Sequence, residues 1–74
     1  MKEEIYKLTG RNIRRARLAL DWTQQELADK IGKSLNFTGK IEIGFSKPSL
    51  DTLIDIAVAL NVPLKNLFDF KQKN

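Results

Sequence analysis

Two helix-start signals separated by a glycine constrain this chain more than any other feature of its sequence. The first signal is Thr23 with Glu26 three residues later, a capping box in which each side chain satisfies a free backbone amide of the other residue. Trp22 and Leu27 are spaced to close a hydrophobic staple over this start. Gly32 can end the helix in the left-handed conformation. We therefore predict a helix over residues 24–31.

A second short helix follows almost immediately. Ser34 can cap it, and it runs from Leu35 to about Ile43, before Gly44. A helix, a tight turn with glycine and a second helix form the arrangement that lays one helix across a phosphate backbone and the next in the major groove of DNA. The buried contacts expected to lock the two helices together are Leu27, Ile31 and Ile41.

Three further helices complete the predicted fold. One precedes the pair and has apolar residues from Ile5 to Leu20 at helical spacing. Gly10 interrupts it, so its first turns either fray or pack very closely. Another begins after Ser49, and its apolar residues Leu50, Leu53, Ile54, Ala57, Val58 and Leu60 form one broad stripe.

The fourth helix ends near Asn61, a plausible left-handed terminator, and Pro63 suits the first turn of a short fifth helix. No alternating strand pattern occurs in the sequence. We therefore expect an all-α fold, a compact five-helix bundle, as one domain over residues 1–70, with residues 71–74 as a flexible C-terminal tail.

The charge of the chain is concentrated in its middle. The net charge is +4, and the excess comes from residues 10–48, which contain eight basic and four acidic side chains. This favours an anionic partner, with nucleic acid first and an anionic membrane second. A solvated charged helix face explains the same charge without a partner. A membrane surface is disfavoured because the apolar stripes are needed inside the bundle.

The composition argues against several functions. The chain of 74 residues has neither cysteine nor histidine, so it lacks thiolate ligands, disulfides and the commonest general base. It has no glycine-rich phosphate loop, and no carboxylate pair stands out from ordinary helix-surface positions. We expect no enzyme activity, no metal or other cofactor, no small-molecule substrate, and a location in the reducing cytoplasm, on the nucleoid when DNA is bound.

Several short motifs occur in an order and at a spacing that resemble a known family. They are Arg14-x-x-Arg17, Trp22-Thr23-Gln24-x-x-Leu27-Ala28, Ile31-Gly32, Ile41-Glu42-x-Gly44, Pro48-Ser49-Leu50-x-Thr52-Leu53 and Ile56-Ala57-x-Ala59-Leu60-x-Val62. Over roughly residues 10–68 the chain resembles the lambda-repressor-like, Cro-type helix-turn-helix domains of phage repressors and restriction-modification controller proteins. The resemblance implies a bundle of five helices that reads operator DNA.

The resemblance also assigns residues to DNA. The positions that align with base readout are Leu35, Asn36, Gly39 and Lys40. An asparagine can pair with adenine, a lysine can reach guanine or a phosphate, and a leucine can contact a thymine methyl. Phe37 either covers the helix pair or leans on a sugar and a thymine. The residues expected near phosphates are Thr23, Gln24, Lys33, Ser34, Phe37, Ile43, Phe45, Ser46 and Lys47.

In the family, the positions of Arg17 and Glu42 form a largely buried ion pair, which implies a structural role for both residues here. The other arginines of the first helix, Arg11, Arg14 and Arg15, are either a solvated face or a binding site. Three residues depart from the family pattern, and together they predict a loosely held recognition helix: Lys33 in the turn, Thr38 at a buried position and Gly39 within a helix. Lys33 could compensate by burying its stem and directing its ammonium at DNA.

The C-terminal segment carries more apolar side chains than a two-turn helix easily buries. They are Val62, Leu64, Leu67, Phe68 and Phe70. We expect them to form the interface of a homodimer on a pseudo-palindromic operator. The alternative is that they cap the core of a monomer.

Taken together, these features predict a sequence-specific regulator of transcription that binds double-stranded DNA. The alternative on the same fold is a protein-interaction module, such as an antitoxin or a co-activator, with weak DNA binding.

Overall fold

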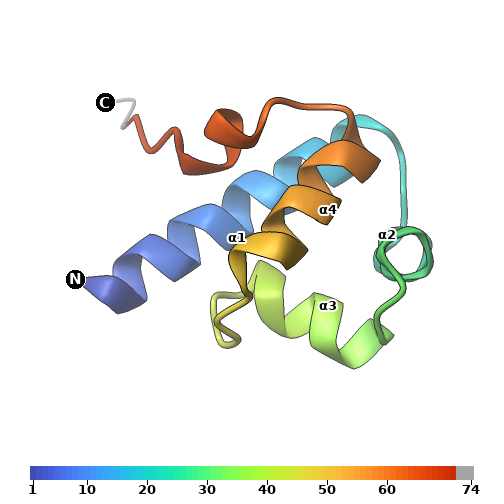
Figure 1. Cartoon of the computed structure of the whole chain (residues 1–74), viewed down its shortest axis with the longest axis horizontal. Helices are drawn as coiled ribbons and strands as arrows, with labels where there is room; N and C mark the ends of the chain where they lie inside the picture. The colour runs from blue at the N-terminus through green and yellow to red at the C-terminus, as the bar shows by residue number, and fades with distance from the viewer. Residues whose placement is uncertain (72–74) are drawn as a thin grey trace.

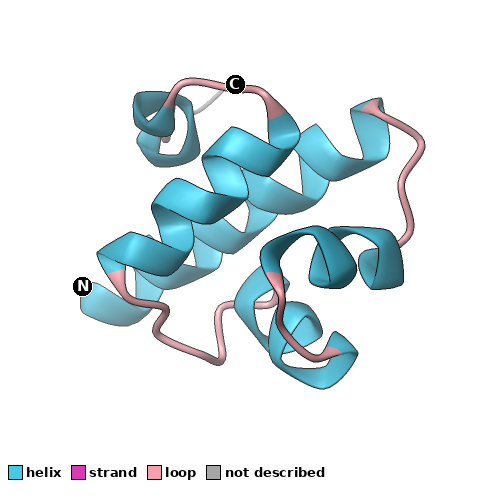
Figure 2. Cartoon of the chain, turned by 45° about the vertical axis from the view of Figure 1, so that its right-hand side comes forward, coloured by secondary structure: helices cyan, strands magenta, loops and turns pink. Residues whose placement is uncertain are grey.

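Four α-helices and one 3-10 helix make up the part of the chain that the structure describes, residues 1–71 of a computed structural model. The elements are α1 (Lys2–Ala19), α2 (Gln24–Ile31), α3 (Leu35–Glu42), α4 (Leu50–Leu60) and the 3-10 helix η1 (Leu64–Phe68). No strand occurs in this range (Figure 2). The all-α class is confirmed, whereas the expected fifth α-helix is a single short 3-10 segment.

Side-chain caps start three of the helices. Thr23 and Glu26 form the predicted capping box, in which the Thr23 hydroxyl accepts from the Glu26 amide at 3.1 Å and the Glu26 carboxylate accepts from the Thr23 amide at 2.7 Å. The Ser34 hydroxyl accepts from the amide of Phe37, and the Ser49 hydroxyl starts α4 in the same way. These bonds satisfy amides that a helix start otherwise leaves without a partner.

Left-handed residues end two of the helices, as the sequence predicts. Gly32 has φ 68° after α2, and Asn61 has φ 58° after α4. Both residue types tolerate this conformation better than others do, because glycine has no Cβ and asparagine can bond locally. The turn between α2 and α3 is therefore short and fixed.

The segment after α4 is anchored to α1 by one side chain. Asn12 donates from Nδ2 to the carbonyl oxygens of Leu67 and Asp69, each at 3.0 Å. Five residues after Pro63 are too few for a stable α-helix, and the tighter 3-10 form suits such short runs. Asn12 satisfies carbonyls at the end of η1 and holds the segment against α1.

Helix α1 continues unbroken through Gly10, which packs closely against α3. A Cβ added to Gly10 would collide with the backbone carbonyls of Ile41 and Glu42. Gly44, with φ 81°, likewise leaves no room for a Cβ, because the backbone of Lys7 lies 2.6 Å from that position. The two glycines let the backbones of α1 and the end of α3 approach at two points.

Helices α1 and α4 lie side by side, with α2 and α3 packed against them and η1 closing the opposite side (Figure 1). Helix α2 contacts both α3 and α4, and α1 contacts α3, α4 and η1. The side chains buried between them form one hydrophobic core: Ile13, Leu27, Ile31, Ile41, Leu53, Ile56, Ala57, Leu60 and Leu67.

The buried face of α1 differs from the one that its apolar residues predict. Ile5 and Leu20 are more than 40% exposed, whereas Gly10 and Arg17 are buried. Thr9 is also buried, and its hydroxyl donates to the carbonyl of Ile5 at 2.8 Å. Polar residues thus occupy part of the interface between α1 and the rest of the molecule, each with its polar atoms paired.

Helix α4 likewise buries only part of its apolar surface. Leu53, Ile56, Ala57 and Leu60 belong to the core. Leu50, Ile54 and Val58 are exposed by 59%, 40% and 73%. Because these three residues recur at every fourth position, they form a second, uncovered apolar stripe along the helix.

Lys71, the first residue of the predicted tail, lies outside any helix, and residues 72–74 lie outside the described part of the chain. None of the helices in residues 1–71 has the length and apolar character needed to cross a bilayer.

Candidate nucleic-acid interface

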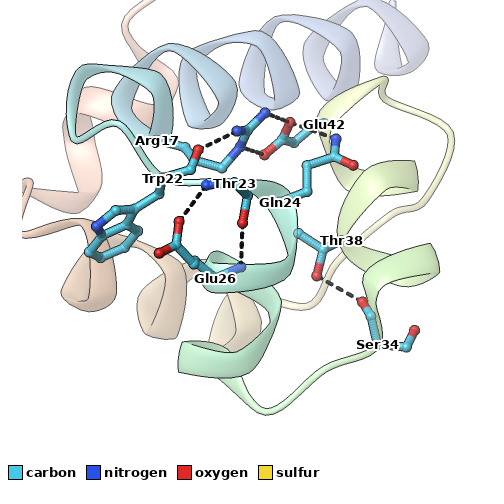
Figure 3. Close-up of polar contacts among 8 residues, drawn as sticks. All are labelled: Arg17, Trp22, Thr23, Gln24, Glu26, Ser34, Thr38 and Glu42. Atoms are coloured by element: carbon cyan, nitrogen blue, oxygen red, sulfur yellow. Dashed lines mark hydrogen bonds and ion pairs between the residues drawn. The ribbon is translucent and has the colours of Figure 1, made fainter.

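A chain of polar side chains connects α1, α3 and the start of α2 (Figure 3). Arg17 donates through Nε and Nη2 to the two carboxylate oxygens of Glu42, at 2.7 and 2.9 Å. Its Nη1 donates to the carbonyl of Trp22 at 2.6 Å. The side chains of Arg17 and Glu42 are 7% and 1% exposed, so this is the buried pair that the family resemblance implies.

Glu42 also fixes the orientation of Gln24, the first residue of α2. The Gln24 Nε2 donates to Glu42 Oε1 at 3.0 Å. Because a carboxylate only accepts, the amide nitrogen of Gln24 must face Glu42. The amide oxygen then lies beside Gly39, 3.4 Å from the position that a Cβ would occupy there. One carboxylate therefore orients both an arginine and a glutamine.

Helix α3 buries one face against the rest of the protein and exposes the other face to solvent. Thr38, Ile41 and Glu42 are buried. The Thr38 hydroxyl donates to the carbonyl of Ser34 at 2.9 Å, so the departure from an aliphatic residue leaves no buried polar atom unpaired there. The predicted loose hold on α3 therefore has no support in its buried contacts.

The four residues expected to read bases lie together on the outer face of α3. Leu35, Asn36, Gly39 and Lys40 line one shallow hollow, to which Gln24 and Ile43 also contribute. Leu35 and Asn36 are exposed, and Gly39 and Lys40 are half-buried. The hollow therefore combines apolar walls with an amide from each of two helices and one ammonium group.

Among the residues expected near phosphates, Thr23 and Ser34 use their hydroxyls as helix caps. Phe37 is half-buried and packs against the core, which favours its role as a cover for the helix pair. Lys33 is exposed, with its ammonium 5.8 Å from the centre of the Phe37 ring. Because the Lys33 side chain is exposed, the prediction that it buries its stem in the turn is not supported.

The loop after α3 presents both apolar and basic side chains. Ile43 and Phe45 are 67% and 73% exposed. The ammonium of Lys40 lies 5.6 Å from the centre of the Phe45 ring. Lys47 is exposed, with its ammonium 5.9 Å from the Tyr6 ring, and Ser46 is half-buried. These cation–π contacts thus connect Lys40 of α3 to the loop, and Lys47 of the loop to α1.

The structure brings basic residues of α1 to this same surface. A second hollow is lined by Lys7, Arg11 and Arg14, and it shares Gln24 and Ile43 with the hollow on α3. Its other lining residues are Glu4, Leu8 and Glu42, and Glu42 is already paired with Arg17. Of the two readings left open for the arginines, this position favours a binding site for Arg11 and Arg14.

The sequence alone does not show that Arg11 and Arg14 lie beside α3, and the reason is physical. Their distance from α3 depends on how closely α1 and α3 cross, which the two glycine contacts determine. The useful signal was Gly10, an apparent helix weakness that marks a close approach of backbones.

The C-terminal residues expected at a dimer interface are only partly available. Leu67 is 1% exposed and belongs to the core, so its assignment to an interface is wrong. Val62 and Leu64 are half-buried and pack against the same core. Phe68 is 38% exposed, and Phe70 is half-buried. The alternative in which this segment closes the monomer core therefore describes most of these side chains.

Comparison with known proteins gives three kinds of match. The helix-turn-helix family matches residues 13–67. A relative from Rhodospirillum rubrum, described as an uncharacterized transcriptional regulator in the ATPase CF(0) region, is 41% identical over 59 residues. That match covers 80% of this chain and 55% of the relative, so the chain spans about half the length of that protein.

Solved structures share the same arrangement. The restriction-modification controller protein C.AhdI from Aeromonas hydrophila is 28% identical, with a TM-score of 0.82 over 85% of this chain and 96% of its own. The hypothetical transcription factor NHTF from Neisseria is 24% identical, with a TM-score of 0.84 over 92% of this chain and 78% of its own. The clp gene regulator ClgR from C. glutamicum is 22% identical, with a TM-score of 0.81 over 85% and 82%. The last two show likeness of fold alone.

Proposed function

Because this chain belongs to the helix-turn-helix family of Cro-type, DNA-binding transcriptional regulators, we propose that it reads a specific operator by inserting α3 into the major groove. The observation that carries this proposal is the outer face of α3, where Leu35, Asn36, Gly39 and Lys40 line one hollow that protein does not cover. A helix of this kind fits the major groove of duplex DNA, where base edges present a distinct pattern for every base pair.

The surroundings of α3 supply the contacts to the DNA backbone. Gln24 lies at the start of α2, where free amides and the helix dipole favour an anion. Lys47, Arg11 and Arg14 are exposed, and the two arginines line the hollow that shares Gln24 and Ile43 with the α3 surface. We assign these residues to phosphates, together with the caps Thr23 and Ser34, whose bonds fix the helix starts.

We further propose that the protein acts as a repressor or controller in the form of a homodimer in the cytoplasm, bound to two half-sites. A single helix-turn-helix grips one half-site, and two copies related by a twofold axis grip a pseudo-palindrome with half-sites about 34 Å apart. The similarity to the controller protein C.AhdI supports a controller role.

The uncovered stripe of Leu50, Ile54 and Val58 on α4 supports a second copy as the occupant of that face. Lys30 and Asp55 line a hollow beside Val58. Neither belongs to an ion pair within residues 1–71, where the one ion pair is Arg17–Glu42. In a twofold dimer, Lys30 of one copy can lie beside Asp55 of the other, and the reverse contact follows by symmetry. We therefore propose that the interface lies on α4.

The experiment that tests the function is selection of bound sequences from random duplexes, followed by titration of the best sequence at several salt concentrations. A half-site that occurs twice and a steep loss of affinity with salt are expected. Lys40→Gln should weaken binding and relax the preference at one position, whereas Lys65→Gln, which removes the same charge from η1, should not.

Weak binding without any preferred half-site would overturn the proposal. It would instead support a protein-interaction module on the same fold, for which the uncovered α4 stripe would be the docking face.

A further inference from the structure

The most unusual feature of the α3 surface is a gap in the middle of it. Leu35, Gly39 and Ile43 follow one another at every fourth position, so they lie on one face of the helix. Leu35 and Ile43 are 45% and 67% exposed, and Gly39 between them has no side chain. The hollow on this surface therefore contains an open space above Gly39, with an apolar side chain at each end. We call this space the gap at Gly39.

Packing within the protein does not require glycine at this position. A Cβ added to Gly39 would lie 3.4 Å from the Gln24 Oε1, which is an ordinary contact with the end of a side chain. The contrast with Gly10 is direct, since a Cβ there would collide with the backbone of α3. Gly39 is not among the residues with a positive φ value. Its backbone is that of a right-handed helix, which other residues can adopt.

Glycine weakens a helix more than any residue except proline. At Gly39 this weakness brings no internal benefit, and the space lies on the surface that we assign to DNA. An approach by a group from outside the protein explains the glycine, and the walls determine what kind of group fits. Leu35 and Ile43 offer only apolar contact, the Gln24 Oε1 beside Gly39 offers a hydrogen-bond acceptor, and Asn36 and Lys40 offer hydrogen-bond donors.

Resting on the proposed function, we propose that the gap at Gly39 holds the C5-methyl group of a thymine in each operator half-site. The thymine methyl is the apolar group among the base edges of the major groove, where the other groups donate or accept hydrogen bonds. Leu35 and Ile43 flank the methyl group, and Gly39 gives the depth for it. Asn36 and Lys40 then read the neighbouring base pairs, so the methyl group determines the register of α3.

The test uses the full chain and the operator obtained by selection. Each thymine of a half-site is replaced in turn by uracil, which keeps the base pair and removes only the methyl group. At one position in each half-site, the substitution should lower the affinity about four-fold, which corresponds to the loss of one buried methyl group. At other thymines the substitution should have little effect.

Variants of the gap connect this loss to Gly39. Gly39→Ala fills the gap, so its affinity for the thymine and uracil operators should differ by less than two-fold. Ile43→Ala removes one wall and should also reduce the ratio of the affinities for the thymine and uracil operators. It provides a second test that does not depend on the folding of Gly39→Ala. Lys65→Ala is the matched surface control and should keep the four-fold ratio.

The outcomes separate this inference from the proposed function. A preferred half-site with no position sensitive to uracil would overturn the inference and leave the function standing. An unchanged sensitivity in both Gly39→Ala and Ile43→Ala would also overturn it. The absence of any preferred half-site would instead overturn the proposed function, and the inference with it.

Discussion

The side chains of Arg17 and Glu42 meet in a two-point ion pair that joins the last turn of α1 to the last residue of α3. Glu42 uses one of the same oxygens to hold the amide of Gln24. The pair therefore has a structural role that reaches the candidate DNA surface, because it determines how the first side chain of α2 is turned.

Loss of one member of this pair should destabilise the fold strongly. Glu42→Leu leaves the buried guanidinium of Arg17 without its carboxylate, and we expect the free energy of unfolding to fall by about 3–5 kcal/mol. The double variant Arg17→Met with Glu42→Leu removes both charges and should recover a large part of that loss. Urea denaturation of the three proteins measures the difference. A double variant less stable than the single one would show that the charge left behind is not the cause.

Two glycines in helices should respond to alanine in opposite directions. Gly10→Ala places a methyl group against the backbone of Ile41 and should cost about 1–3 kcal/mol or more, since neither helix can move aside without repacking. Gly39→Ala should leave stability unchanged or raise it by up to about 1 kcal/mol. Thermal unfolding followed by circular dichroism compares them directly. Equal effects of the two substitutions would contradict the contacts described for both glycines.

The arginines of α1 should contribute to DNA binding through phosphates. Replacing Arg11 and Arg14 with glutamine removes two such contacts from each copy, so the slope of log affinity against log salt should fall by about two for each half-site. The preferred sequence should stay the same, because phosphates carry no direct sequence information. The double variant Lys65→Gln with Lys71→Gln changes the net charge equally and serves as the control. The same change of slope in both double variants would mean that only the overall charge matters.

A charge in the α4 stripe should weaken the association of the two copies. Val58→Asp places a carboxylate on the most exposed residue of that stripe, in the proposed twofold interface, and should weaken the dimer at least ten-fold, as loss of an important apolar contact does. Leu18→Asp changes a similarly apolar exposed residue on α1 and should not affect association. Sedimentation velocity over a range of concentrations measures both. A wild-type protein that stays monomeric with and without operator would rule out the homodimer.

The boundaries of α2, α3 and α4 could be predicted because they depend on bonds between near neighbours. Thr23, Ser34 and Ser49 each cap a helix through an amide three residues away, and Gly32 ends α2 in a conformation that few other residues adopt. Such signals are complete within a few residues of sequence. A short helix after Pro63 was predicted as well, but its attachment to α1 was not, because the partner that holds it, Asn12, lies far away in the sequence.

The faces of α1 and α4 were harder to predict for a different reason. Hydrophobic periodicity assumes that apolar residues are buried, yet in α1 the buried positions include Arg17, whose charge is balanced by Glu42 far along the chain. In α4 apolar residues occupy more than one face, so the pattern alone does not show that Val58 is left uncovered. The outer face of α3 could be predicted from the family resemblance, whereas the placement of Arg14 beside it required the crossing of α1 and α3.

The contact at Gly10 has a consequence for how the protein would tolerate an imperfect operator. Helices separated by side chains can shift relative to one another as those side chains change rotamer, but at Gly10 the two backbones touch with nothing between them. A poor fit between α3 and a groove would then be absorbed by the duplex through bending, twisting or a change of groove width. Operators would be ranked partly by the flexibility of base pairs that no side chain reaches.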